Sequence, residues 1–219
     1  MFVNPANERY IQWLFPIREQ GLNSQAYPLQ PHEIKIISSS AEMQTRLRTS
    51  LRLMLDFYGM TLSKPPSLLV TRHSDPVVRR RQYRNLNLSY HNYLRITRIF
   101  KSLTELGQQD YVGSILLFIL SEQSEWECLD GRDLRGSMDR YWVYCMRNRE
   151  MQATVANAIK WVREAGGVFT EGMYRRVVER REKDGVWRFE PLVDRVEEED
   201  GEDESRHIIG IPGHTYGSE

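Results

Sequence analysis

The sequence predicts an all-α fold: a single compact domain of about six or seven helices, followed by an acidic tail. Three observations support this class. Apolar residues recur every three or four positions in several separate segments, as they do on the buried face of a helix. Glycine follows several of these segments, at the place where a helix ends. No long segment alternates strictly between apolar and polar residues, as a half-buried strand would.

The first element lies in the aromatic segment, residues 10–23, which reads YIQWLFPIREQGLN. Tyr10, Trp13 and Leu14 stand at positions i, i+3 and i+4, so a short helix places them on one face. Pro16 disfavours helical geometry in the residue before it and ends that helix. We therefore expect the indole of Trp13 and the rings beside it to be buried inside the helical domain.

A long helix is predicted between Ser39 and Gly59, after an extended connector at Pro28–Pro31. Ser39 and Glu42 have the spacing of a capping box, in which each side chain accepts a hydrogen bond from the backbone amide of the other residue. Gly59 is placed to end the helix in a left-handed conformation. The apolar stripe consists of Met43, Leu47, Leu51, Met54 and Tyr58.

The next stretch contains prolines and a basic run, and it predicts a loop with a short helix near Pro76–Arg84. A second long helix is expected near Asn92–Leu106, followed by Gly107. The helix Tyr111–Glu125, with Asp110 as its cap, is apolar nearly all round and should lie in the middle of the domain. The apolar face of the second long helix is Ile96, Ile99, Phe100, Leu103 and Leu106.

Three shorter helices complete the prediction. Their apolar residues lie in Met138–Met146, Val155–Val162 and Met173–Val178. Residues 184–193 are expected to pack in an extended form on the surface. The predicted organisation is a loose N-terminus at 1–9, a helical domain at 10–193 and an acidic, disordered tail at 194–219.

The composition argues against several functional classes. Thirty lysines and arginines balance thirty aspartates and glutamates, and this net charge of zero disfavours extensive nucleic-acid binding. Cys128 and Cys145 are too few for a disulfide framework and indicate reduced thiols in an intracellular protein. We expect no signal peptide, because no basic stretch followed by an apolar one opens the sequence. We expect no transmembrane span, because the longest apolar run, Ile115–Leu120, is far short of the roughly 20 residues that cross a bilayer.

No catalytic or metal-binding pattern is recognisable. The five histidines lack a cysteine or carboxylate at zinc-ligand spacing, and neither a phosphate-binding glycine loop nor a nucleophile elbow occurs. Cys145 lies on an apolar helical stripe and is interpreted as an inert thiol. We therefore expect no catalytic residue, no metal and no cofactor. An unrecognised hydrolase is kept as an alternative, because folding can bring distant residues together.

Three blocks of the chain resemble a known family. The aromatic segment is similar to the opening signature of the opioid growth factor receptor family, and Leu53–Gly59 and Asn92–Gly107 resemble the next two family blocks in the same order. The resemblance covers roughly residues 10–172. It implies a non-enzymatic receptor for an opioid peptide of the Met-enkephalin type, associated with regulation of cell proliferation. It also implies a location at the nucleus and perinuclear membrane or in the cytoplasm.

Polar residues of the aromatic segment are candidate peptide contacts. Trp13, Arg18 and Asn23 could line a pocket, because tryptophan and arginine are common where binding energy is concentrated. In the alternative interpretation, Arg18 forms an ion pair and Asn23 stabilises a turn, so that both residues hold the segment in place.

A second group of candidates lies on the predicted helix Asn92–Leu106. Arg95, Arg98 and Lys101 are three residues apart and share one side of this helix, as a solvated face or as a basic ridge. Such a ridge could bind the carboxylate of a peptide or an acidic partner, including this chain's own acidic tail.

Two further binding classes remain open. The first is an intracellular helical scaffold that binds a protein partner through the basic ridge or the acidic tail. The second is a weakly nucleic-acid-associated nuclear protein, in which Arg79–Arg81 and Arg84 contact phosphates or act as an import signal. The balanced net charge disfavours the second class.

Overall fold

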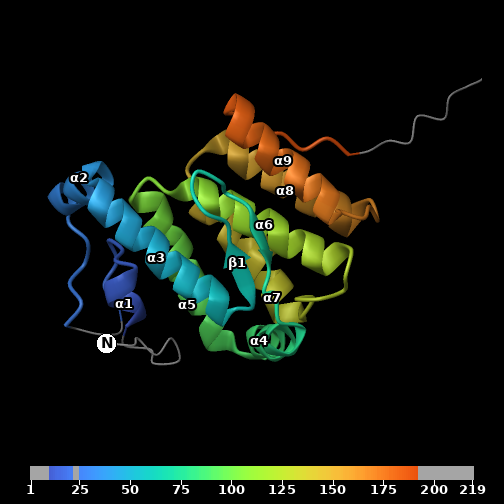
Figure 1. The fold of residues 1–219 in the computed structure, drawn as a ribbon, viewed down its shortest axis with the longest axis horizontal. Helices are drawn as coiled ribbons and strands as arrows, with labels where there is room; N and C mark the ends of the chain where they lie inside the picture. The colour runs from blue at the N-terminus through green and yellow to red at the C-terminus, as the bar shows by residue number, and fades with distance from the viewer. Residues whose placement is uncertain (1–9, 22–24, 192–219) are drawn as a thin grey trace, which may run out of the picture.

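The computed structural model of the protein describes residues 10–21 and 25–191 (Figure 1). This part of the chain is mostly helical, which confirms the predicted all-α class; the predictions for residues 1–9 and 194–219 lie outside it. The elements are α1 (Ile11–Leu14), α2 (Pro31–Ser39), α3 (Ala41–Phe57), β1 (Met60–Leu62), β2 (Val70–Arg72), α4 (Pro76–Leu88), α5 (Tyr90–Glu105), α6 (Gln109–Ser124), α7 (Arg132–Ser137), a π-helical turn (Met138–Trp142), a 3-10 turn (Val143–Cys145), α8 (Arg149–Glu164) and α9 (Glu171–Asp184).

The centre of the domain is α6. Every residue from Tyr111 to Gln123 is buried, because this helix carries apolar side chains on nearly all sides. Helices α5, α8 and α9 and strand β2 all contact it. In Figure 1, α6 lies between α3 and α5 on one side and α8 and α9 on the other. The prediction of a central helix is confirmed.

The apolar stripes predicted for α3 and α5 are also largely confirmed. All five predicted core residues of the α5 stripe are buried, and so are Leu47, Leu51, Met54 and Tyr58 of the α3 stripe, whereas Met43 at its start is 39% exposed. The glycines that follow these helices, Gly59 and Gly107, have φ angles of +83° and +80°. Glycine adopts this conformation without steric cost, so the chain can turn sharply there.

The start of α3 lies one residue later than predicted. Ser40, not Ser39, caps the helix by accepting a hydrogen bond from the Met43 amide at 3.3 Å. Ser39 instead ends α2, a helix missing from the prediction: none of its residues is fully buried, and only Ile34 and Ile37 pack against the core. The capping box belongs to α2, where the Gln30 amide donates to Glu33 Oε2 at 2.7 Å.

A two-stranded antiparallel hairpin occupies part of the stretch for which the sequence predicts a loop. Strands β1 and β2 pair Met60 with Arg72 and Leu62 with Val70. The Val70 amide also donates to the Tyr174 hydroxyl at 2.6 Å, which ties the hairpin to α9. Strands of three residues are too short to produce a recognisable alternating pattern, so this hairpin is not visible in the sequence.

Residues 138–146 do not form the regular helix that the sequence predicts. They continue α7 as a π-helical turn and then a 3-10 turn. Met138, Trp142 and Met146 are buried as expected, but Tyr141 is 61% exposed. A π-helical turn contains more residues than an α-helical one, so it rotates Tyr141 away from the face that holds the other apolar side chains.

Residues 185–191 lie mostly on the surface, as predicted, but one side chain of this segment is inserted into the core. Trp187 is 2% exposed, and its Nε1 donates to Asp110 Oδ1 at 3.2 Å. Its carbonyl accepts a hydrogen bond from Thr154 Oγ1 at 2.9 Å. Asp110 also accepts from Arg181 at 2.7 Å and does not cap α6, whose N-cap is Gln108. The predicted cap is therefore an anchor for the C-terminal part of the domain.

Replacement of Trp187 by alanine should lower the free energy of unfolding by about 3–5 kcal/mol, because it removes a buried indole and leaves a cavity. Urea denaturation of the full chain, followed by circular dichroism, measures this loss. Val168→Ala, at a position 52% exposed, is the control and should change stability by less than about 1 kcal/mol. A loss below about 1 kcal/mol for the tryptophan variant would contradict this role.

Candidate functional site

The aromatic segment is half buried and half exposed. Its helix, α1, ends before Phe15, which has a non-helical conformation as expected for a residue that precedes proline. Phe15 is completely buried and Ile11 is nearly so. Trp13, however, is 60% exposed and Tyr10 is 41% exposed. The prediction that Trp13 lies inside the domain is wrong, because four residues of helix cannot turn every large side chain towards the core.

The aromatic segment is held on α5 by basic side chains. Arg98 Nε donates to the carbonyl oxygen of Phe15 at 2.9 Å, and Lys101 Nζ lies 2.6 Å from Glu19 Oε1. Arg18 Nε lies 2.9 Å from Glu105 Oε2, at the end of α5. The hydrogen bond from Lys101 lowers the pKa of Glu19, so this carboxylate stays charged and paired at neutral pH.

Four of the five predicted peptide-binding residues lie at or near this junction of α1 and α5. Trp13 and Arg18 flank the buried Phe15 in the sequence, and Arg98 contacts the same residue from α5. Arg95 Nη1 donates to the side chain of Asn92 at 2.9 Å, further along α5. Asn23 lies outside the described residues. The structure therefore places Arg98 and Lys101 against the chain's own aromatic segment.

Arg98 and Arg18 differ in how far their side chains are exposed to solvent. Arg98 is partly buried, and burial lowers the pKa of its guanidinium. The Arg18 side chain is 51% exposed, although Glu105 is only 13% exposed and also pairs with Arg147. An anionic ligand could therefore approach Arg18 from solvent, whereas Arg98 is suited to hold the backbone of the aromatic segment.

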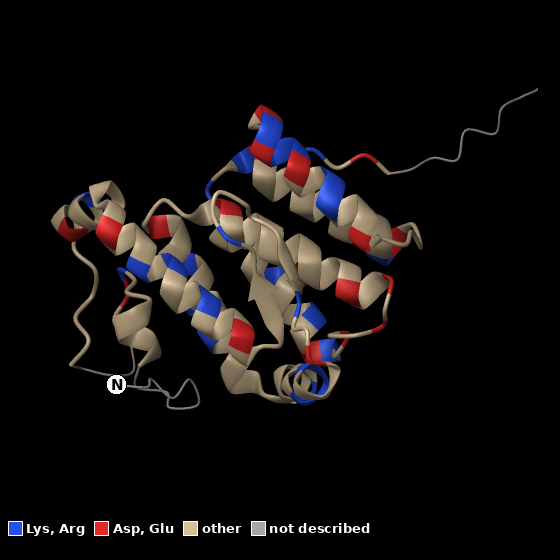
Figure 2. Ribbon diagram, in the orientation of Figure 1, with Lys and Arg blue, Asp and Glu red and all other residues tan. Residues whose placement is uncertain are grey.

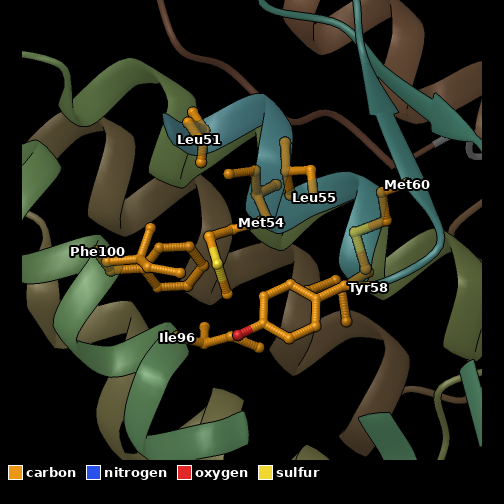
Figure 3. A pocket seen from close by; sticks show the side chains of 10 residues that line it. Leu51, Met54, Leu55, Tyr58, Met60, Ile96 and Phe100 are labelled. Atoms are coloured by element: carbon orange, nitrogen blue, oxygen red, sulfur yellow. The ribbon is translucent and has the colours of Figure 1, made fainter. Parts of the chain in front are cut away.

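A small cavity lies on the other side of α5, between α3 and α6 (Figure 3). Its volume is about 10 Å³, roughly the space of one water molecule. The lining is apolar, and Tyr58 contributes its ring to it. The Tyr58 hydroxyl is turned towards Ile96 and has no hydrogen-bond partner among the described residues. Burial raises the pKa of this hydroxyl, so it stays neutral. This cavity is too small to receive an aromatic side chain of a peptide.

A buried ion pair between β2 and α6 was not predicted from the sequence. Arg72 Nε donates to Glu122 Oε1 at 2.7 Å, and the Glu122 side chain is 2% exposed. The Arg72 guanidinium also lies 4.0 Å from the centre of the Trp126 ring, a cation–π contact. Burial alone would lower the pKa of Arg72, but its hydrogen bond to Glu122 raises it. Fifty residues separate the partners, so no local pattern indicates the pair.

The described residues offer little reactive chemistry. Burial raises the pKa of Cys145 to about 11 and also raises that of Cys128, so both thiols are weak nucleophiles at neutral pH. Within residues 10–21 and 25–191, no three histidine, cysteine or acidic side chains are arranged to hold a metal ion. In the same ranges, no helix combines the length and apolar character needed to cross a bilayer.

Comparisons with known proteins identify one family. Residues 5–176 match the family described as "Opioid growth factor receptor (OGFr) conserved region". The opioid growth factor receptor of Homo sapiens is 40% identical over 146 residues, which are 67% of this chain and 21% of that protein. The opioid growth factor receptor of Mus musculus is also 40% identical over 146 residues, which are 67% of this chain and 22% of that protein.

A second group of relatives carries a related name. Opioid growth factor receptor-like protein 1 of Rattus norvegicus is 38% identical over 143 residues, which are 65% of this chain and 30% of that protein. The matched region therefore spans less than a third of each of these relatives. No solved structure matches the chain significantly.

Replacement of Tyr58 by phenylalanine should increase the free energy of unfolding by about 1 kcal/mol, because it removes a buried hydroxyl that has no partner in the described part of the chain. Tyr174→Phe is the matched control. This second hydroxyl is bonded to Ser114 and to the Val70 amide, so its loss should destabilise the protein by about 1–3 kcal/mol. Denaturant titrations of both variants test the difference in sign, and destabilisation by Tyr58→Phe would reveal an unrecognised partner.

Replacement of Arg98 by methionine should destabilise the protein by about 1–3 kcal/mol, because it leaves the carbonyl of the buried Phe15 without its hydrogen bond. Lys101→Met, which breaks a more exposed ion pair with Glu19, should cost less than about 1 kcal/mol. Thermal unfolding of the two variants gives the comparison. Equal losses would mean that Arg98 does not hold the aromatic segment.

Proposed function

The chain belongs to the opioid growth factor receptor family, and on this premise we propose that it is a binding protein without catalytic activity. Its proposed ligand is a short opioid peptide of the Met-enkephalin type. The proposed binding surface is the outer side of the junction between α1 and α5, with Trp13 and Arg18 as contacts. Asn23 and Arg95 remain further candidate contacts, and Arg98 is a candidate that acts through the aromatic segment.

The observation that carries this proposal is the exposed indole of Trp13. This side chain is 60% exposed, although Ile11 and Leu14 of the same helix pack against the core. Transfer of a large aromatic side chain from water into an interface stabilises the complex, and tryptophan is enriched at the energetic centres of interfaces. Arg18, five residues later in the same segment and 51% exposed in its side chain, adds a cation to the proposed surface.

The chemistry of an enkephalin-type peptide suits such a surface. The peptide has aromatic and apolar side chains and a terminal carboxylate, so one end can stack on the indole while the carboxylate binds a guanidinium. The Arg18 side chain is 51% exposed and open to a ligand, but Glu105 already pairs with it. The ligand carboxylate must therefore compete with Glu105 or share the guanidinium with it, which favours modest affinity.

The small size of the cavity supports a surface site. The space beside Tyr58 has a volume of about 10 Å³ and could not hold a tyrosine or phenylalanine ring without repacking of the core. A peptide that bound there would have to separate α3 from α5. Binding on the outer surface requires no such change.

Family membership also supports a proposal about the location of the protein and its role in the cell. We propose that the protein acts inside the cell, at the nucleus and perinuclear membrane or in the cytoplasm, and that ligand binding regulates cell proliferation. Its matched relatives are between three and five times longer than the shared region, so their other segments can supply parts of this activity.

An intracellular protein-interaction scaffold is the second candidate. Apolar side chains remain exposed on α5 and on the turns that contact it: Leu94 is 49% exposed, Tyr141 is 61% exposed and Tyr144 is 70% exposed. Exposed aromatic residues are typical of protein interfaces. This candidate would gain support if a protein partner bound the wild-type chain and lost affinity for a Tyr141→Ser/Tyr144→Ser variant.

Titration calorimetry of the full chain with Met-enkephalin tests the proposed function. Wild-type protein should release or absorb heat on binding, and Trp13→Ala should weaken affinity about 10- to 100-fold, the range expected for loss of a central aromatic contact. Because Trp13 is largely exposed, its replacement should change the melting temperature little.

The control is Leu88→Ala, which removes an apolar side chain that is 75% exposed at the end of α4. This variant should bind the peptide with unchanged affinity. Absence of heat with wild-type protein would reject the peptide ligand, and equal affinity for Trp13→Ala and wild type would reject the α1–α5 surface.

A further inference from the structure

Charge is strongly segregated along this neutral chain. Residues 76–104 contain seven lysines and arginines and no aspartate or glutamate. Residues 197–204 contain seven acidic residues in eight positions and no basic residue. The net charge of zero therefore hides two blocks of opposite sign, which attract each other through water over about 10 Å at moderate salt.

Most of the seven cations of residues 76–104 have partners within the described part of the chain. Arg98 and Lys101 hold the aromatic segment, Arg95 donates to Asn92, and Arg79 donates to the carbonyl of His73 at 3.2 Å. The remaining three form no salt bridge or hydrogen bond with any described residue, and all three are exposed. They are Arg80, Arg81 and Arg84.

These three arginines lie together on the outer side of α4. At 100° per residue, Arg81 and Arg84 lie on one stripe with Val77 and Leu88, and Arg80 borders it. Val77 is 76% exposed and Leu88 is 75% exposed. The outer face of α4 is thus a basic stripe with an exposed apolar residue at each end. Figure 2 shows α4 with basic and no acidic residues.

The sequence of the chain contains a segment with the complementary order. Residues 197–204 are acidic, Val193 and Val196 precede them, and Ile208 and Ile209 follow them. An apolar–acidic–apolar segment can pair its carboxylates with the arginines and cover Val77 and Leu88 with its flanking side chains. A nucleic acid would satisfy the charges but would leave the apolar ends of the stripe in water, so an acidic polypeptide fits better.

The length of the chain allows this contact within one molecule. Pro191 is the last residue that the structure describes, and Glu204 follows thirteen residues later, which is enough chain to span about 45 Å when extended. A domain of about 190 residues has a radius of gyration of roughly 16 Å, so the acidic segment can reach any face of it. Attachment to the same chain also raises the effective concentration of the segment to about the millimolar range.

We propose that the acidic segment 197–204 docks on the outer face of α4, where its carboxylates pair with Arg80, Arg81 and Arg84. The contact is intramolecular and electrostatic. It covers a surface that is distinct from the α1–α5 junction, and it does not depend on peptide binding there. A partner that competed for either the acidic segment or the α4 stripe would release the other.

A zero-length carbodiimide coupling of the full chain tests this contact. Arg81→Lys keeps the positive charge but provides an amine that can be coupled to a neighbouring carboxylate. Arg176→Lys is the matched control, because Arg176 is also exposed, lies in a helix and forms no salt bridge with a described residue. Mass spectrometry of the digested monomer then identifies the coupled peptides.

Coupling of position 81 to residues 197–204 should exceed coupling of position 176 to the same segment by about tenfold. It should disappear in about 1 M salt, where the screening length falls to roughly 3 Å. Equal coupling at both positions, or none at position 81, would overturn the proposal. Coupling found only in dimers would assign the segment to a second copy, and duplex DNA binding that required Arg81 and Arg84 without coupling would assign the stripe to nucleic acid.

Discussion

A helix that is apolar on nearly every side is stable in water only when other elements cover it completely, and α6 imposes this requirement on the whole domain. Thirteen consecutive residues of α6 are buried. No single neighbour can cover them, so the chain must pass around α6 several times. The contacts of α5, α8, α9 and β2 with this one helix are the result.

Polar side chains on α6 determine how the covering elements are oriented. Ser114 donates to the carbonyl of Leu68 at 2.6 Å, and Glu122 pairs with Arg72 of β2. Gln123 donates to the carbonyl of Leu129, and Asp110 accepts from Trp187. Apolar packing tolerates small shifts, but a buried polar group without a partner costs about 1–3 kcal/mol. These few hydrogen bonds therefore favour one arrangement of the elements packed around α6.

The surfaces available for recognition consist of side chains that remain exposed after their neighbours have packed into the core. Phe15 is inserted into the domain and Arg98 holds its carbonyl, so Trp13, two residues earlier, is turned towards solvent. The outer face of α4 is similar, because Tyr83 and Leu86 take the buried side and leave the arginines outside. On both surfaces the exposed side chains point away from the core, so they can vary without loss of the fold.

Local sequence patterns determined the long helices, the central position of α6 and the glycine turns after α3 and α5, because periodic burial and backbone freedom are properties of a few neighbouring residues. Residue type alone suggested Trp13, Arg18, Asn23, Arg95 and Arg98 as candidate ligand contacts, and this assignment stays a prediction. Only the tertiary structure decided that Trp13 is exposed, that Asp110 binds Trp187 and that Arg72 pairs with Glu122. Those outcomes depend on which distant segment lies opposite each side chain, and burial and pairing across tens of residues have no signature in the local sequence.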